Sequence, residues 1–121
     1  MWNTPTQEEL NKLPPTGHYS NIPLKEIVIH QHYFLGSADW WVSEYDPEYN
    51  LIYGYACLGD QQMAEWGYTS FDELKNLKVN PHHSPMSFEV DRDLHWTAKP
   101  VPQIPEILAC YKAQGLESLL E

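Results

Sequence analysis

Basic residues are scarce in this sequence. Only seven of its 121 residues are Lys or Arg, against 17 Asp or Glu, and the formal net charge is −10. The single arginine is Arg92. A protein that binds nucleic acid needs clustered Lys and Arg to neutralise phosphates. The composition therefore argues against direct binding of DNA or RNA, and for the same reason against an anionic membrane surface.

Cysteines and long hydrophobic runs are also few. Cys57 and Cys110 do not have the spacing of a metal-binding pair, and two cysteines make no disulfide framework. We expect two reduced thiols, with a single disulfide as the alternative. No run approaches the roughly 20 apolar residues of a spanning helix, and no signal-peptide pattern opens the sequence. We therefore expect the protein in the cytoplasm of the cell that makes it.

Motifs for nucleophilic catalysis and phosphate binding are missing as well. The sequence contains no G-x-S-x-G motif, no Gly-rich phosphate loop, and no cysteine with the His context of a known family. The glycines at positions 54, 59 and 67 fit strands and turns instead. The sequence predicts no catalytic residue, no metal and no cofactor.

Hydrophobic residues make up 42% of the chain and aromatic residues 13%, enough for the core of one domain over residues 1–121. A first helix is predicted with Thr4 as its N-cap and Pro5 as its first residue, ending before Pro14. Runs rich in β-branched and aromatic residues follow, separated by turn signals. The predicted strands are 27–35, 40–45, 51–58 and 63–68. Short connections favour an antiparallel meander.

The second half of the chain predicts a helix, a strand and a helix. Ser70 and Glu73 have the spacing of a capping box and open a short helix that ends at Asn80-Pro81. A fifth strand is predicted over 88–96 and a C-terminal helix over 105–121, weakened near its middle by Gly115. The predicted fold class is α+β, an antiparallel β-meander of about five strands with short flanking helices and a C-terminal helix.

Acidic residues dominate the predicted meander. Between Glu26 and Leu74 there are nine Asp or Glu and no Lys or Arg. We expect these carboxylates to gather on one sheet face and its turns. One interpretation is a solvated surface that aids solubility. The other is an anionic surface that docks on a cationic groove of a partner protein. The aromatic residues available as anchors are Trp40, Trp41, Tyr45, Tyr49 and Tyr53.

Histidines and acids also raise the question of a metal site. His30 and His32 are two apart on a predicted strand, so both point to one face, and an acid from a neighbouring strand would complete a site. His82 and His83 lie in a predicted loop. A carboxylate cluster for Mg²⁺ would use Glu44, Asp46, Glu65, Asp91 and Asp93. A simpler interpretation pairs Arg92 with a carboxylate across the sheet.

The order of short motifs along the chain resembles a known family. The residues that carry the resemblance are Thr6, Glu8, Glu9, Leu10, Leu13, Pro14, Tyr33, Phe34, Trp40, Trp41, Glu44, Asp46, Tyr53, Gly54, Glu65, Gly67, Tyr68, Ser70, Phe71, Glu73, Leu74, the run Asp91–Trp96 and Pro100. Over about residues 6–102 the chain resembles the family catalogued as domain of unknown function 2958, carried by plasmids, phages and integrative elements. Asp91 departs from the Glu expected there. The resemblance implies a passenger gene of a mobile element and assigns no catalytic residue.

These observations lead to one principal hypothesis and two alternatives. The principal hypothesis is a mobile-element accessory protein that binds another protein, as an anti-restriction or anti-CRISPR inhibitor with a DNA-mimicking acidic face. The expected partner is a host nucleic-acid-processing protein with a basic groove. The residues predicted for the binding face are Trp40, Glu44, Asp46, Glu48 and Glu65. The alternatives are a metal-dependent nuclease or hydrolase and a self-assembling module of plasmid maintenance.

Overall fold

The computed structural model describes residues 1–81 and 84–121. The α-helices are α1 (Gln7–Asn11), α2 (Phe71–Asn76) and α3 (Pro105–Ala113). The 3-10 helices are η1 (Leu24–Glu26), η2 (Gln61–Met63), η4 (Val101–Gln103) and η5 (Glu117–Leu120). The strands are β1 (Val28–Ile29), β2 (Gln31–Leu35), β3 (Ala38–Asp46), β4 (Leu51–Leu58), β5 (Glu65–Ser70), β6 (Lys78–Val79), β7 (Phe88–Glu89), β8 (Asp91–Arg92) and β9 (Lys99–Pro100).

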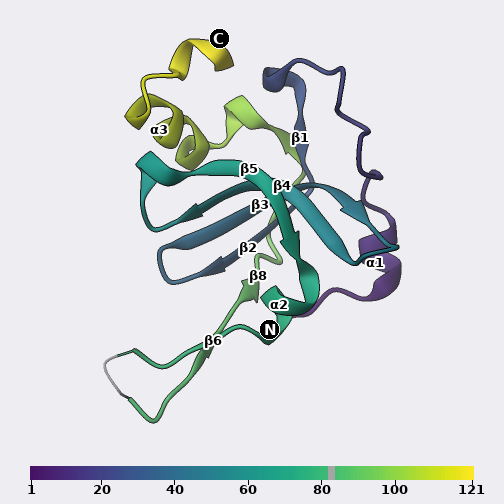
Figure 1. Ribbon diagram of the computed structural model, residues 1–121, viewed down its shortest axis with the longest axis vertical. Helices are drawn as coiled ribbons and strands as arrows, with labels where there is room; N and C mark the ends of the chain where they lie inside the picture. Colours follow the sequence, from purple (N-terminus) through teal and green to yellow (C-terminus); the bar gives the residue numbers. More distant parts are fainter. Residues whose placement is uncertain (82–83) are drawn as a thin grey trace.

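The centre of the fold is a five-stranded antiparallel sheet in the order β5-β4-β3-β2-β8 (Figure 1). Strands β2 to β5 follow one another in the chain and pair with their neighbours, so the predicted meander is confirmed. Strand β8 adds a fifth strand beside β2. Two small sheets, β1-β9 and β6-β7, complete the strand pairing. The sheet and its helices confirm the predicted α+β class.

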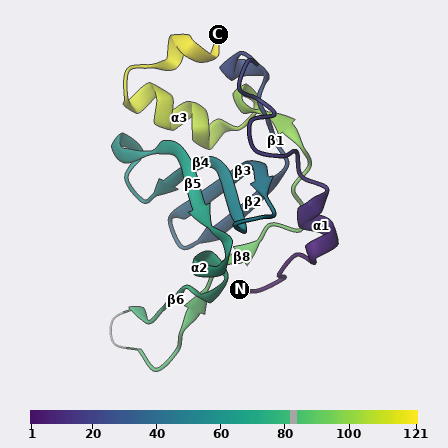
Figure 2. The ribbon, with the colours of Figure 1, turned by 45° about the vertical axis from the view of Figure 1, so that its right-hand side comes forward.

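Both faces of this sheet are covered. Figures 1 and 2 show α3 on one side of the sheet and α1 and α2 on the other. The first hydrophobic cluster joins Trp41 and Tyr55 of the sheet to Ile107 and Tyr111 of α3. The second hydrophobic cluster joins residues on the opposite face of the sheet to α1 and α2. Its sheet members include Tyr33, Trp40, Val42, Tyr45 and Ile52. The acidic stretch therefore does not build one open sheet face, as the sequence had predicted.

A β-bulge in β3 changes which side chains face which layer. Val42 pairs with Gly54 of β4, but the next paired residue of β3 is Glu44, opposite Tyr53, so Ser43 is the extra residue. Successive side chains of a regular strand alternate between faces, and an extra residue reverses the alternation beyond it. The bulge turns Glu44 to the face that carries Trp41 and returns Tyr45 to the face of Val42.

The first helix begins two residues later than predicted. Thr6 is the N-cap, and the Thr6 side chain and the Glu9 side chain each accept the other residue's backbone N–H in a complete capping box. The predicted N-cap at Thr4 is wrong. Thr4 and Thr6 are both possible N-cap residues, and the capping box at Thr6 satisfies two backbone N–H groups at once.

Three predicted boundaries also need correction. The strand predicted over 27–35 is divided at His30, where β1 turns away to pair with β9. The strand predicted over 88–96 is only β7 and β8, which belong to different sheets. Helix α2 ends at Asn76 rather than Asn80, since Lys78 and Val79 pair with β7. The β6-β7 hairpin extends away from the main sheet (Figure 1).

The C-terminal region confirms the predicted interruption near Gly115. Helix α3 ends at Ala113, and Gly115 has a φ of 71°, which favours glycine. The chain then forms η5 and buries Leu120 against the first cluster. Over the described part of the chain, no helix has the length and apolar character needed to cross a membrane.

Candidate functional site

Four acidic residues lie at one end of the main sheet. Asp46 ends β3, Glu48 lies in the β3–β4 turn, and Asp72 and Glu73 occupy the first turn of α2. The backbone N–H of Phe71 donates to the carbonyl of Asn50 over 3.0 Å, which joins the turn to the start of α2. We call Asp46, Glu48, Asp72 and Glu73 the acidic end.

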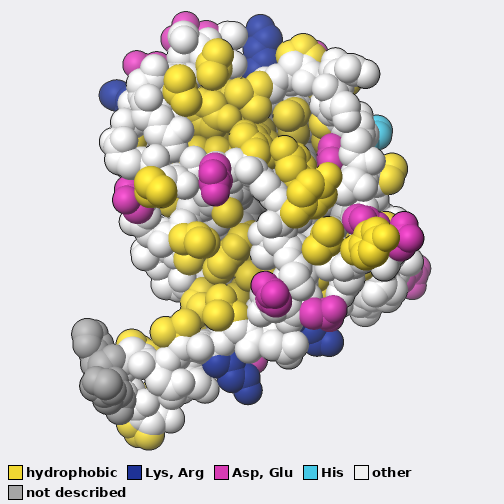
Figure 3. All heavy atoms as spheres, in the orientation of Figure 1, with side chains coloured by type: hydrophobic (Ala, Val, Ile, Leu, Met, Phe, Trp, Pro, Cys, Tyr) yellow, Lys and Arg dark blue, Asp and Glu magenta, His cyan; other side chains and the backbone are white. Residues whose placement is uncertain are grey.

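The local sequence explains this placement. The Asp46 carboxylate accepts the backbone N–H of Glu48 over 2.9 Å, which shapes the turn. The Ser70 hydroxyl accepts the backbone N–H of Glu73 over 3.2 Å, so the predicted cap of α2 is confirmed. In Figure 3, acidic side chains lie over the region where Figure 1 places the β3–β4 turn and α2.

The acidic end forms no ion pair within the residues described. None of the ion pairs found within 1–81 and 84–121 includes Asp46, Glu48, Asp72 or Glu73. Tyr49, at the centre of the β3–β4 turn, leaves 69% of its surface exposed. The end of the sheet therefore presents anionic groups around an exposed aromatic ring.

Trp40, predicted for the binding face, lies inside the protein. Only 8% of its surface is exposed, and it packs in the second hydrophobic cluster beneath the sheet. The prediction took an aromatic pair on a strand as surface, but Trp40 and Trp41 point into the two opposite core layers. Trp40 is therefore corrected to a core residue.

Glu44, also predicted for that face, is buried with 4% of its surface exposed. One carboxylate oxygen accepts the backbone N–H of Gly17 over 3.0 Å and the other accepts that of Tyr19 over 2.9 Å. Because the Ser43 bulge turns Glu44 inward, this carboxylate organises the 17–19 loop and is not part of an open acidic surface. Glu44 is corrected to a buried site residue.

Glu65 is exposed but lies away from the acidic end. It begins β5 opposite Ala56, whereas the acidic end lies at the far end of β5, opposite Leu51. Five residues of strand separate the two positions, a distance of about 17 Å at the usual strand rise. Of the five predicted face residues, the structure therefore brings together Asp46 and Glu48.

The histidines have separate partners. The Nε2 atom of His30 lies 2.9 Å from the Tyr19 hydroxyl, and burial lowers the pKa of His30. His32 lies between Asp39 and Asp93, at 2.8 and 3.2 Å. Among the residues placed by the structure, no three His, Cys, Asp or Glu are arranged to hold a metal ion. His82 and His83 lie outside the described residues.

The acids named for a Mg²⁺ cluster are dispersed. Asp91 accepts from the Asn3 amide over 2.8 Å, while Asp93 contacts His32. The guanidinium of Arg92 donates to Glu9 of α1 over 2.9 Å. The predicted pairing of Arg92 with a carboxylate on a neighbouring strand is wrong, because its partner Glu9 lies in helix α1.

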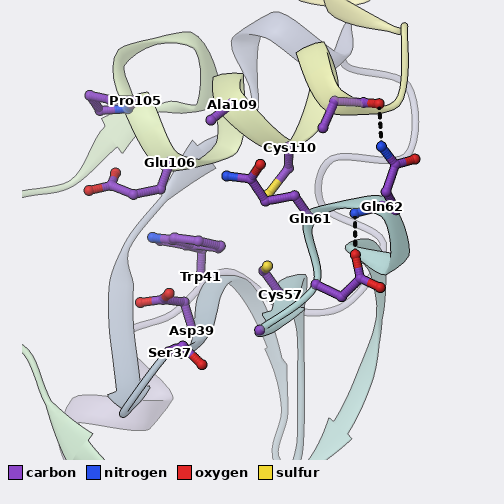
Figure 4. A pocket seen from close by; sticks show the side chains of 13 residues that line it. Ser37, Asp39, Trp41, Cys57, Gln61, Gln62, Pro105, Glu106, Ala109 and Cys110 are labelled. Atoms are coloured by element: carbon purple, nitrogen blue, oxygen red, sulfur yellow. Dashed lines mark hydrogen bonds between the residues drawn. The ribbon is translucent and has the colours of Figure 1, made fainter.

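A cavity of about 700 Å³ lies between the sheet and α3. Figure 4 shows Cys57 of β4 and Cys110 of α3 on its opposite walls, with Trp41 beside them and Asp39 below. Both thiols are free and buried. Burial raises the pKa of Cys110 to about 12, and the neighbouring Cys57 adds to this effect. The raised pKa keeps the Cys110 thiol protonated at neutral pH, as is typical of a core cysteine.

Sequence reasoning counted Asp72 and Glu73 among the nine acids of the stretch, but did not include them in the predicted binding face. The capping box at Ser70 was the available signal. It starts α2 directly after β5, and the end of β5 lies beside the β3–β4 turn. Sequence reasoning also missed Tyr19, Trp66 and Tyr68 as the lining of a second cavity. No local motif identifies them, since they come together only when the 17–27 loop closes over the sheet.

Comparisons with known proteins give one match. The family model described as "Protein of unknown function (DUF2958)" matches residues 19–105, which include every strand from β1 to β9 and end at the first residue of α3. The match begins after the Thr6–Leu10 segment that contributed to the resemblance. No curated protein and no solved structure was found to match the chain.

Proposed function

The chain belongs to the DUF2958 family, and we propose that it is an accessory protein of a mobile genetic element that acts by binding another protein. Its binding surface in this proposal is the acidic end together with Tyr49. The observation that carries the proposal is the group of four carboxylates without an internal ion pair in the described residues.

Charge and exposure both support a protein partner. Like charges held together destabilise a folded chain, so a concentrated anionic surface has a cost that a cationic partner offsets. An exposed tyrosine supplies apolar area that a partner can bury at the centre of such a surface. The net charge of −10 favours encounter with basic surfaces over long distances.

The proposed partner is a nucleic-acid-processing protein of a bacterial host. Grooves that bind DNA or RNA are lined by Lys and Arg, and a rigid anionic surface competes for them. In this proposal the protein occupies such a groove on a restriction or CRISPR enzyme in the host cytoplasm and inhibits it. The mobile-element setting follows from the family resemblance, while the anionic surface provides the physical support.

Affinity capture with matched charge variants tests the proposal. Wild-type protein is compared with Glu48→Lys/Asp72→Lys, since neither of these side chains accepts a hydrogen bond within the described residues. The control is Glu106→Lys/Glu117→Lys, which makes the same charge change at exposed positions of α3 and η5. Each protein is incubated with lysate containing restriction and CRISPR enzymes at about 50 mM and about 500 mM salt.

The expected result is a nucleic-acid-processing protein retained by wild type and by the control, but not by Glu48→Lys/Asp72→Lys. High salt should release it, and duplex DNA should compete for it. Equal retention by the acidic-end variant, or a partner unaffected by salt and DNA, would overturn the proposal. A homo-oligomer that buries the acidic end would support self-assembly instead.

A further inference from the structure

A cavity of about 440 Å³ lies between the 17–27 loop and strands β4 and β5. Four aromatic rings and one carboxylate line it, from Tyr19, Tyr53, Trp66, Tyr68 and Glu44. We call these five residues the aromatic cage. Figure 3 shows hydrophobic side chains gathered on this face, between α3 and the segment that leads into β1.

The rings of the aromatic cage are held in place by defined contacts. The ring of Tyr53 lies 6.1 Å from that of Trp66 in a stacked arrangement and 4.9 Å from that of Tyr68. The indole N–H of Trp66 donates to the hydroxyl of Tyr111 in α3 over 2.8 Å. The hydrogen bond from α3 therefore fixes the position of the Trp66 ring in the free protein.

The loop side of the cage is fixed in the same way. The Tyr19 hydroxyl lies 2.9 Å from Nε2 of His30, and the backbone N–H of Tyr19 donates to Glu44. Because burial lowers the pKa of His30, its imidazole is neutral near pH 7 and shares a hydrogen bond with the Tyr19 hydroxyl. Tyr19 is thereby held across the cavity from Tyr53 and Trp66.

Glu44 brings a buried negative charge to the cage without a cationic partner among the described residues. Its two oxygens each accept one backbone N–H, which leaves acceptor capacity on an ionised carboxylate. No Lys, Arg or His lines the described wall of this cavity. The nearby Lys25 directs its ammonium to the carbonyl of Glu121, at 3.4 Å.

The charge of Glu44 reaches the aromatic hydroxyls of the cage. Burial raises the pKa of Tyr53, and the charge of Glu44 raises it further. Burial also raises the pKa of Tyr19, with Glu44 acting in the same direction. Both phenols are therefore neutral at physiological pH, and the face of a neutral Tyr ring attracts a cation.

From this arrangement we propose that the aromatic cage binds a methylated ammonium group, with Glu44 as its counter-charge. Ring faces attract cations, and this attraction is strongest where the cation is shielded from water. A primary ammonium needs three hydrogen-bond acceptors, more than one partly used carboxylate supplies. A quaternary ammonium needs none and presents methyl groups that pack on rings. A cavity of about 440 Å³ lies within the range of small-ligand sites.

This site is made of other residues than the acidic end, and the proposal does not depend on the proposed function. The methylated ammonium is carried either by a free small molecule or by a trimethylated lysine side chain of a protein. Both sources present the same chemical group to the cage, so the probes below include one of each.

Calorimetric titration of the wild-type protein with three probes tests the site. The probes are tetramethylammonium, choline, and the amide of acetylated Nε-trimethyl-lysine. The neutral analogue of choline, 3,3-dimethylbutanol, has the same shape without the charge, and guanidinium tests a cation without methyl groups. We expect saturable binding of at least one methylated probe and affinity at least about 10-fold lower for dimethylbutanol and guanidinium.

Variants then assign the binding to the cage. Tyr68 leaves 60% of its surface exposed, so Tyr68→Leu should fold and lose at least about fivefold in affinity. Tyr68→Phe keeps the ring and should bind as wild type does. Phe88→Leu, which removes an exposed aromatic ring on the β6-β7 hairpin, is the matched control and should also be unchanged.

Glu44→Gln tests the counter-charge and should weaken binding by about 10-fold or more. If this variant does not fold, the Tyr68 series still decides the outcome. The proposal is overturned if wild type binds none of the methylated probes up to about 100 mM, well beyond the millimolar range of weak binding. It is also overturned if Tyr68→Leu binds as well as wild type, or if guanidinium or dimethylbutanol binds equally well. Preference for trimethyl-lysine over choline identifies a protein side chain as the source, and the reverse preference identifies a small molecule.

Discussion

The Nε2 atom of His32 lies 2.8 Å from a carboxylate oxygen of Asp39, on the neighbouring strand β3. On its other side, Nδ1 of His32 lies 3.2 Å from Asp93, just beyond β8. The imidazole also stacks on Trp41, with ring centres 5.5 Å apart. One side chain thus joins three strands of the main sheet, and its ionisation should influence how firmly they hold together.

The stability contributed by His32 should depend on pH. Burial alone lowers the pKa of His32. The carboxylates of Asp39 and Asp93 accept hydrogen bonds from its imidazole, and this effect is larger, so the pKa lies above its ordinary value. A raised pKa in the folded state stabilises the protein fully below the unfolded pKa, and this stabilisation is lost as pH rises through the folded pKa. His32→Gln should therefore lower the Tm more at about pH 6 than at about pH 8.5. Thermal unfolding of wild type, His32→Gln and the exposed-site control His95→Gln measures this, and an equal loss at both pH values would contradict it.

The two buried thiols should resist modification in the folded protein. Since burial raises the pKa of Cys110 to about 12, almost no thiolate is present near pH 8. Reaction with Ellman's reagent should be at least about 100-fold slower in the native protein than in guanidinium chloride. Cys57→Ala leaves one thiol and assigns the slow phase. Immediate reaction of both native thiols would show that the cavity between β4 and α3 is open to the reagent.

Gly54→Ala should severely destabilise the sheet. A Cβ atom at Gly54 would lie 1.9 Å from the backbone oxygen of Trp41, which cannot move without breaking the β3–β4 pairing. We expect a loss of about 3 kcal/mol or more in the free energy of unfolding, or failure to fold. Gly67 pairs with Gly54 across β4 and β5, but a Cβ there meets nothing within 4 Å, so Gly67→Ala should change stability by less than about 1 kcal/mol. Urea unfolding of both variants measures the difference, and equal effects would be inconsistent with the close approach at Gly54.

Ser70→Ala should lower the free energy of unfolding by about 1 kcal/mol, because it removes the side-chain acceptor that caps α2. Ser70→Asp retains an acceptor at the same position and should remain close to wild type. Urea unfolding compares the three proteins. If Ser70→Ala and Ser70→Asp were equally destabilised, the hydroxyl would act through something other than the cap.

The sequence predicted the elements whose signals are local. Strand β4 coincides with the prediction over 51–58, because its aromatic and β-branched run ends at the turn signals on both sides. The start of α2 was predicted from the Ser70–Glu73 spacing alone. The interruption at Gly115 also depends on one residue with a positive φ. Such features depend on residues close together in the chain, so they can be predicted from a single sequence.

The candidate site was harder to predict, because burial depends on what covers the sheet. Alternation shows that Trp40 and Trp41 point to opposite faces, but with helices on both faces neither points to water. The inward turn of Glu44 depends on a bulge that no residue pattern marks. The segments that carry Asp72 and Glu73 and Asp46 and Glu48 are joined by a backbone hydrogen bond between Phe71 and Asn50, which only the folded chain reveals.

The bulge at Ser43 also ties the length of β3 to the placement of its side chains. Because Ser43 is the extra residue, Val42 and Glu44 lie on opposite faces as consecutive strand residues do, and deleting Ser43 would leave Tyr45 in the core. Pairing Ser43 in a regular ladder would instead exchange the faces of everything that follows in β3, so that Tyr45 would leave the core and Asp46 would enter it. We therefore expect family members to keep or lose the residue at position 43 together with the bulge.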